Sequence, residues 1–84
     1  MPESTKVTVL FLGPLGDLAG KDSLELDAPV DWQSLLDAVG AEVAAQLRLE
    51  RVNVACAGKV LAEKTKLQAN AGDEIALLPP VSGG

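Results

Sequence analysis

Residues 71–84 read AGDEIALLPPVSGG, and this ending decides how the rest of the chain is interpreted. Residues 74–78 form a short apolar run with the length of one strand, and a Gly-Asp turn signal precedes it. Pro79 and Pro80 follow, and neither has a backbone N–H with which to continue a sheet. The ending therefore predicts a last strand, a firm stop and an extended exit.

The final glycines give this exit a possible use. Gly83 and Gly84 carry no side chains, so they can thread a narrow channel that larger residues would block. Four residues beyond the prolines reach at most roughly 14 Å, which suffices to place a terminal carboxylate inside a partner's cleft. We expect Val81 and Ser82 to complete this tail. A glycine tail without function is the alternative.

The beginning of the chain predicts a hairpin. Apolar residues alternate in KVTVLFLG, residues 6–13, as in a strand with one buried face. Leu10 and Leu12 make the second face apolar as well. Residues 13–22 predict a turn-rich connection, and residues 23–27, SLELD, predict a short half-exposed strand.

The middle of the chain predicts helix and then strand. Asp31 is a suitable helix N-cap, and an apolar stripe of helical period follows it, with Gly40 as a break between two helices. That stripe consists of Leu35, Leu36, Val39, Val43 and Leu47. Residues 51–57 alternate as a third strand, and residues 60–61 suit a brief partner strand.

This order of elements predicts an α+β fold. A hairpin, a crossover helix and further strands suit a mixed sheet with one or two helices packed across one face, which is a β-grasp roll. We expect residues 1–81 to form this single domain and residues 82–84 to form a flexible Gly-Gly tail.

Composition excludes several classes of function. The chain has 84 residues, a net charge of −5, no histidine and one cysteine, Cys56. A Cys-His or Ser-His pair, a zinc site of usual spacing and an internal disulfide are therefore ruled out. The negative charge disfavours nucleic acid as a partner, and no apolar segment has membrane length. We expect a cytoplasmic protein in which Cys56 is a buried core residue.

The opening KVTVLFLGPLGDLAGKD and the ending AGDEIALLPPVSGG together resemble a known family. The chain is similar to the MoaD/ThiS-like sulfur carriers, which are ubiquitin-like in fold and include the small subunit of molybdopterin synthase. The similarity covers about residues 6–84, and the Pro-Pro before the terminal glycines is its most specific part.

The resemblance implies a two-stage cycle centred on Gly84. An ATP-dependent enzyme adenylates the Gly84 carboxylate, and sulfur then replaces one oxygen to give a thiocarboxylate. The tail enters the large subunit of a heterotetrameric synthase, where sulfur passes to the pterin precursor of the molybdenum cofactor. This chain then needs no metal, bound cofactor or catalytic side chain of its own, because ATP binds to the activating enzyme and catalysis takes place in the large subunit.

Three alternatives remain at this point. The carrier could serve thiamine or another thiolated metabolite, or the chain could be a ubiquitin-like modifier conjugated through Gly84. An independent enzyme that uses the neighbouring carboxylates of Asp73 and Glu74 is disfavoured, since no base, metal site or phosphate loop accompanies them.

The apolar surplus on the strands also predicts a docking surface. We expect Leu10, Leu12 and Leu78 to form an exposed patch for a partner. The alternative is that residues 13–22 fold over these leucines and bury them.

Overall fold

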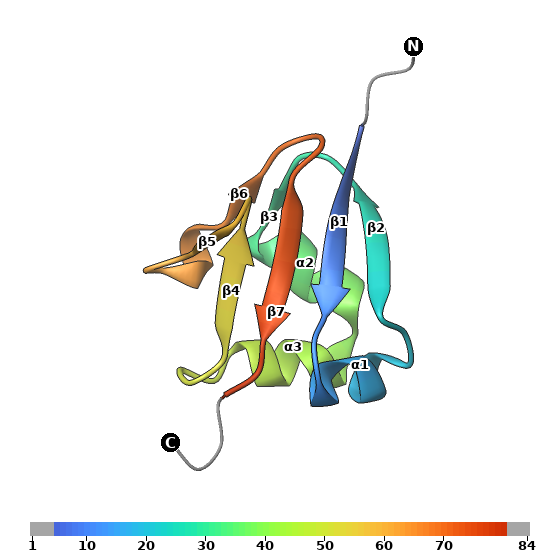
Figure 1. The fold of residues 1–84 in the computed structure, drawn as a ribbon, viewed down its shortest axis with the longest axis vertical. Helices are drawn as coiled ribbons and strands as arrows, with labels where there is room; N and C mark the ends of the chain where they lie inside the picture. Colours follow the sequence, from blue (N-terminus) through green and yellow to red (C-terminus); the bar gives the residue numbers. More distant parts are fainter. Residues whose placement is uncertain (1–4, 81–84) are drawn as a thin grey trace.

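The first and last strands of the chain lie side by side at the centre of a five-stranded sheet (Figure 1). The structure is a computed structural model and describes residues 5–80. Strand order in the sheet is β2-β1-β7-β4-β5. The central pair of β1 and β7 is parallel, and every other pair in this sheet is antiparallel. The strands span Lys6–Phe11 (β1), Ser23–Asp27 (β2), Asn53–Cys56 (β4), Lys59–Val60 (β5) and Glu74–Leu78 (β7).

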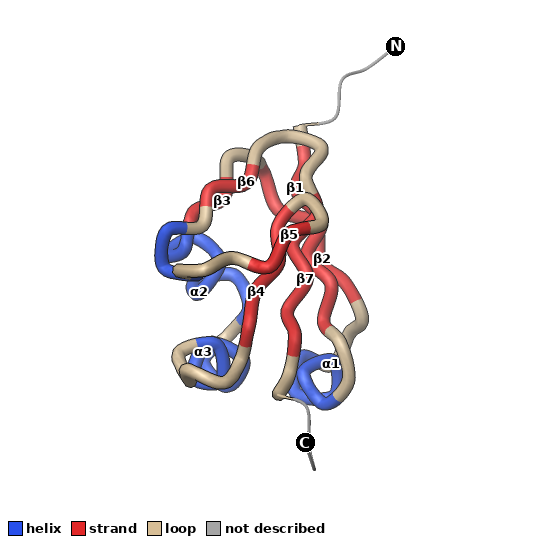
Figure 2. The backbone as a smooth tube through the Cα atoms, turned by 60° about the vertical axis from the view of Figure 1, so that its left-hand side comes forward, coloured by secondary structure: helices blue, strands red, loops and turns tan. Residues whose placement is uncertain are grey.

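Two helices, α2 (Trp32–Val39) and α3 (Ala41–Leu47), cover one face of the sheet (Figures 1 and 2). Asp31 caps α2, since its carboxylate accepts a hydrogen bond of 2.8 Å from the backbone N–H of Ser34. That hydrogen bond lowers the pKa of Asp31. Gly40 separates the two helices with φ of 91°, a value that L side chains rarely adopt.

The core lies between these helices and the inner face of the sheet. Every second residue of β1 and β7 points into it, as the alternation predicts. Because Phe11 and Trp32 are the only aromatic residues of the chain, the core is almost entirely aliphatic. Its fully buried large side chains are Val7, Val9, Val30, Leu35, Val43, Leu47, Val52, Val54, Leu67, Ile75 and Leu77.

A lysine connects the polar segment before the last strand to the loop that follows α3. Lys64 lies in the 3-10 helix η1 (Lys64–Lys66), and its ammonium donates hydrogen bonds to the carbonyls of Leu49 and Val52. Partial burial lowers the pKa of this lysine. The segment is thereby tied to the loop between α3 and β4.

The prediction of a mixed sheet with helices on one face is confirmed, and with it the β-grasp architecture. The prediction for residues 13–22 is wrong in part, because Pro14–Ala19 forms the helix α1. Pro14 begins this helix, where a missing N–H costs nothing, and Gly20 ends it in the left-handed conformation. Sequence analysis also missed a small second sheet of β3 (Val30–Asp31) and β6 (Gln68–Ala69).

We predict that Leu77→Ala destabilises the domain by about 3 kcal/mol, because it removes a large side chain that is fully buried at the centre of the sheet. Urea unfolding followed by circular dichroism measures the change. Leu12→Ala is the matched control, since that leucine is 40% exposed and should cost less than about 1 kcal/mol. Equal losses in both variants would contradict this account of the core.

Candidate functional site

An apolar row crosses four strands on the sheet face that the helices leave open. Strand pairing aligns Val60 with Ala55, Ala55 with Ala76, and Ala76 with Leu10. Leu10 and Ala76 are half-buried, and Val60 is 59% exposed. Apolar residues aligned in this way form one continuous surface rather than scattered single contacts.

Two further leucines extend this row toward the end of the sheet where the last strand stops. Leu78 is half-buried and lies opposite Asn53, and Leu12 follows β1 at the next position of the same face. Leu12 is 40% exposed. The structure thus brings together the three predicted interface residues, and we call Leu10, Leu12, Val60, Ala76 and Leu78 the outer patch.

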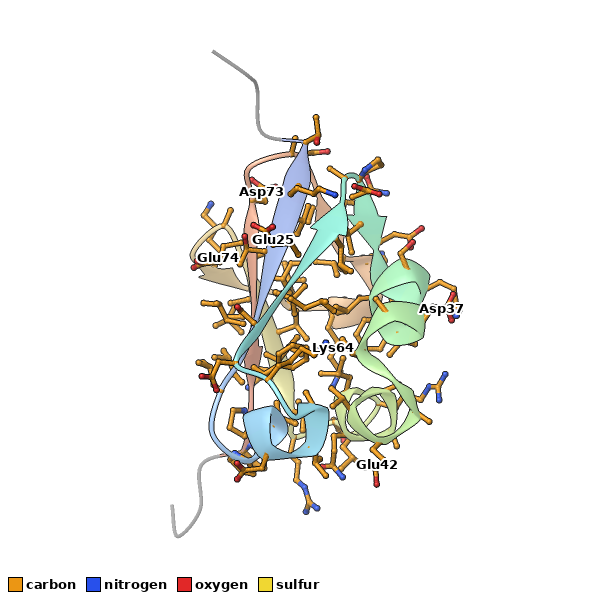
Figure 3. The ribbon with its side chains drawn as sticks, turned by 90° about the vertical axis from the view of Figure 1, so that its right-hand side faces the viewer. Glu25, Asp37, Glu42, Lys64, Asp73 and Glu74 are labelled. Atoms are coloured by element: carbon orange, nitrogen blue, oxygen red, sulfur yellow. The ribbon has the colours of Figure 1, made fainter. Side chains whose placement is uncertain are left out.

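Helix α1 does not cover the outer patch. It lies at the end of the sheet, where it contacts α3 and β1 (Figures 1 and 3). Leu15 anchors it there and is buried in the core. The alternative that residues 13–22 fold over the leucines is therefore wrong.

The other half of the same face is acidic. Glu25 and Glu74 lie on either side of Thr8 in neighbouring strands, and both carboxylates are exposed. Figure 3 shows them with Asp73 on the side of the sheet away from the helices. One row further, the Lys6 ammonium lies 2.5 Å from the Asp27 carboxylate and lowers the pKa of that group. An acidic rim beside an apolar patch suits a partner with a basic rim, since complementary charge speeds encounter.

The base of the C-terminal tail lies beside the outer patch. Pro79 is half-buried and Pro80 is exposed. Gly13 approaches closely, since a Cβ at that position would lie 3.4 Å from Cγ of Pro79. Gly13 also has φ of 57°, so a side chain there would strain the backbone. The turn after β1 therefore braces the start of the tail.

The remaining predicted tail residues lie outside the described residues. They are Val81, Ser82, Gly83 and Gly84. Within residues 5–80, no group of three His, Cys, Asp or Glu side chains could hold a metal ion. Over the same residues, no helix has both the length and the apolarity to cross a membrane.

Comparison with known proteins places the chain in a family. The model of the ThiS family matches residues 9–84. The chain belongs to the ThiS family. The resemblance to MoaD/ThiS-like carriers is thereby confirmed.

Relatives of this ThiS-family chain include carriers and modifiers. A molybdopterin synthase sulfur carrier subunit of Dictyostelium discoideum is 28% identical, over 96% of this chain and 99% of that protein. The crystal structure of SAMP1 from Haloferax volcanii is 31% identical, with a TM-score of 0.69 over 94% of this chain and 99% of that one. One chain from the complex of subunits 1 and 2 of the molybdopterin-converting factor of Helicobacter pylori is 25% identical, with a TM-score of 0.63 over 94% and 99%.

The prediction that Cys56 is buried in the core is wrong in part, because Cys56 packs against the core but the structure leaves it half-buried. Cys56 is the last residue of β4 and lies opposite Lys59 and Ile75, at the margin of the sheet. Partial burial, with a smaller contribution from the Asp73 carboxylate, raises the pKa of its thiol. The raised pKa disfavours the thiolate, which is the nucleophilic form of this side chain.

Sequence reasoning missed Val60, Ala55 and Gly13 as parts of the site. The first two had a signal, because a tight turn at Ala57-Gly58 fixes the register that pairs Ala55 with Val60. Gly13 had none, since its contact with Pro79 joins residues far apart in the sequence.

We predict that Cys56 reacts slowly with iodoacetamide near neutral pH, and that the pH midpoint of its alkylation lies above that of the same thiol in the urea-unfolded chain. The physical reason is the desolvation that disfavours the thiolate. Mass spectrometry of timed reactions gives both profiles. A midpoint in the folded chain at or below the unfolded value would contradict the prediction.

Proposed function

We propose that this chain is a sulfur carrier for molybdopterin synthesis and that its reactive group is the carboxylate of Gly84. The observation that carries the proposal is the place where the last strand ends. The last strand ends beside the apolar outer patch, and the prolines follow directly. A partner that docks on the patch would receive the terminal glycines in its own cleft. The 28% identical sulfur carrier subunit supports this assignment.

Each step of the proposed chemistry modifies the terminal carboxyl group of Gly84. The Gly84 carboxylate attacks the α-phosphorus of ATP on an activating enzyme, and pyrophosphate leaves. Sulfide then attacks the carbonyl carbon, so that a C–S bond forms while the bond to AMP breaks. The sulfur of the resulting thiocarboxylate attacks the pterin precursor, and water then cleaves the C–S bond to the Gly84 carbonyl, which returns the carrier to a carboxylate. The finished cofactor holds its metal through a dithiolene group on the pterin. This group contains two sulfurs, so two carriers are used for each product.

The proposed partners follow from this cycle. They are the large subunit of molybdopterin synthase and an ATP-dependent adenylating enzyme, in the cytoplasm. The complex of subunits 1 and 2 in the Helicobacter pylori relative supports a large-subunit partner. Catalytic groups are assigned to these partners, because this chain has no histidine and burial raises the pKa of its one thiol.

A second function, protein modification, is favoured by one relative. SAMP1 of Haloferax volcanii, which is 31% identical to this chain, is a small archaeal modifier protein. The same activated Gly84 would then form isopeptide bonds with lysines of target proteins. Lysine-linked conjugates through Gly84 in cell lysate would support this function, whereas a free chain carrying one sulfur supports the carrier. A thiamine carrier would instead fail to supply the pterin-converting subunit.

We predict that removing Gly84, or adding one alanine after it, abolishes sulfur transfer and leaves the fold intact, because the reacting carboxyl must be the terminal one. Intact-mass analysis after incubation with ATP, activating enzyme and sulfide checks for exchange of one oxygen for sulfur. One alanine added before Met1 is the matched control and should load normally. Normal loading of the C-terminally extended chain would overturn the proposal.

We also predict that Leu12→Glu weakens binding to the large synthase subunit at least about tenfold, because it places a charge in the outer patch. Leu49→Glu is the matched control: this leucine is 36% exposed, against 40% for Leu12, and lies outside the patch. Calorimetry with each folded variant measures affinity. Equal affinities would show that the outer patch is not the interface.

A further inference from the structure

The two edges of the sheet differ in length. Strand β5 forms one edge with two residues, which is too short to template another strand. Strand β2 forms the other edge with five residues, and no strand among residues 5–80 pairs with its outer side. The long edge therefore offers a row of backbone groups that the described part of the chain does not use.

Hydrogen bonding to β1 identifies which backbone groups point outward. The N–H of Ala28 donates to the carbonyl of Thr5, and the N–H of Phe11 donates to the carbonyl of Asp22, both at 2.9 Å. Bonded and open positions alternate along an antiparallel strand, so even-numbered residues of β2 bond to β1. The N–H and C=O groups of the odd-numbered positions then face away from the sheet. These positions are Ser23, Glu25 and Asp27.

The two sides of this edge differ in chemistry. Leu24 and Leu26 are half-buried against the core on the side of the helices. A hollow of about 110 Å³ lies next to Leu24, and Lys21 contributes a polar side chain to its wall. Its other lining residues are Phe11, Ala19 and residues 38–40. On the opposite side, Glu25 and Asp27 are exposed, and Figure 3 looks onto this edge with Glu25 pointing away from α2. An added strand would meet an apolar side and an acidic side.

Charge decides what can pair here. A second copy that paired antiparallel with Glu25 opposite Glu25 would place like charges side by side, and each chain carries a net charge of −5. Exposed carboxylates alone would only protect the edge from such pairing. Apolar surface at the edge is not needed for protection, and the half-buried Leu24 and Leu26 suit inward-pointing apolar side chains of another strand.

We propose that the β2 edge binds an extended segment of a partner protein in which apolar and basic residues alternate. The segment adds a strand to the sheet, with apolar side chains toward Leu24 and Leu26 and a basic one beside Glu25, whereas Asp27 is already paired with Lys6. The tail leaves from β7, two strands away, so this contact is separate from the sulfur chemistry.

Amide hydrogen exchange of the full-length, 15N-labelled chain tests the proposal. The probe is a capped seven-residue peptide that alternates valine and lysine, at about 1 mM, and the control peptide has the same residues in two blocks. At nine-tenths occupancy, exchange at Ser23, Glu25 and Asp27 should slow about tenfold with the alternating peptide only. Unchanged exchange, or equal slowing by both peptides, would overturn the proposal. Slowing that rises with protein concentration and needs no peptide would assign the edge to a second copy and overturn it too.

Matched charge reversals test the recognition. Glu25→Lys should weaken binding of the alternating peptide about fivefold. Glu42→Lys makes the same change of charge at an exposed position of α3 and should leave the affinity unaltered. Slow exchange at Val9 confirms that each variant is folded. Equal affinity for both variants would contradict the role of the acidic side. The assay needs no activating enzyme, so its failure would leave the sulfur-carrier proposal intact.

Discussion

The parallel pairing of the first and last strands is the constraint on which the rest of this structure depends. Residues 8–11 pair with residues 74–77, so the two ends of the domain meet at the centre of the sheet. Parallel neighbours require a crossover, and the helices that provide it must pack on one face. Because the last strand is central, the chain leaves the sheet from its middle, with the open face of the sheet on one side and α2 and α3 on the other.

The size of the domain explains why the second face of the sheet stays open. A chain of 84 residues builds one helical layer, and that layer buries the inner residues of the strands. On the open face of the sheet, apolar and acidic side chains occupy different regions. Apolar side chains lie near the exit of the tail, and carboxylates lie at the opposite end. A partner with the inverse arrangement can dock in one orientation only, and this orientation would direct the tail.

Local patterns predicted most of the fold, because strands and helices of this chain follow their sequence periods closely. Residues 23–27, Asp31 and Gly40 behave as the sequence indicates, since alternation, capping and helix termination are local effects. Helix α1 was missed because six residues are too few for a clear helical period. The half-burial of Cys56 and the contact of Gly13 with Pro79 depend on distant segments. No local pattern in the sequence encodes either one.

The geometry of the central strands also determines how the domain responds to tension. β1 and β7 run in the same direction, so the beginning of one and the end of the other lie at opposite ends of the ladder. A force that pulls the chain apart by its two ends acts along both strands. The hydrogen bonds between them, including that from Thr8 N–H to the Asp73 carbonyl, are then sheared together instead of opening one after another.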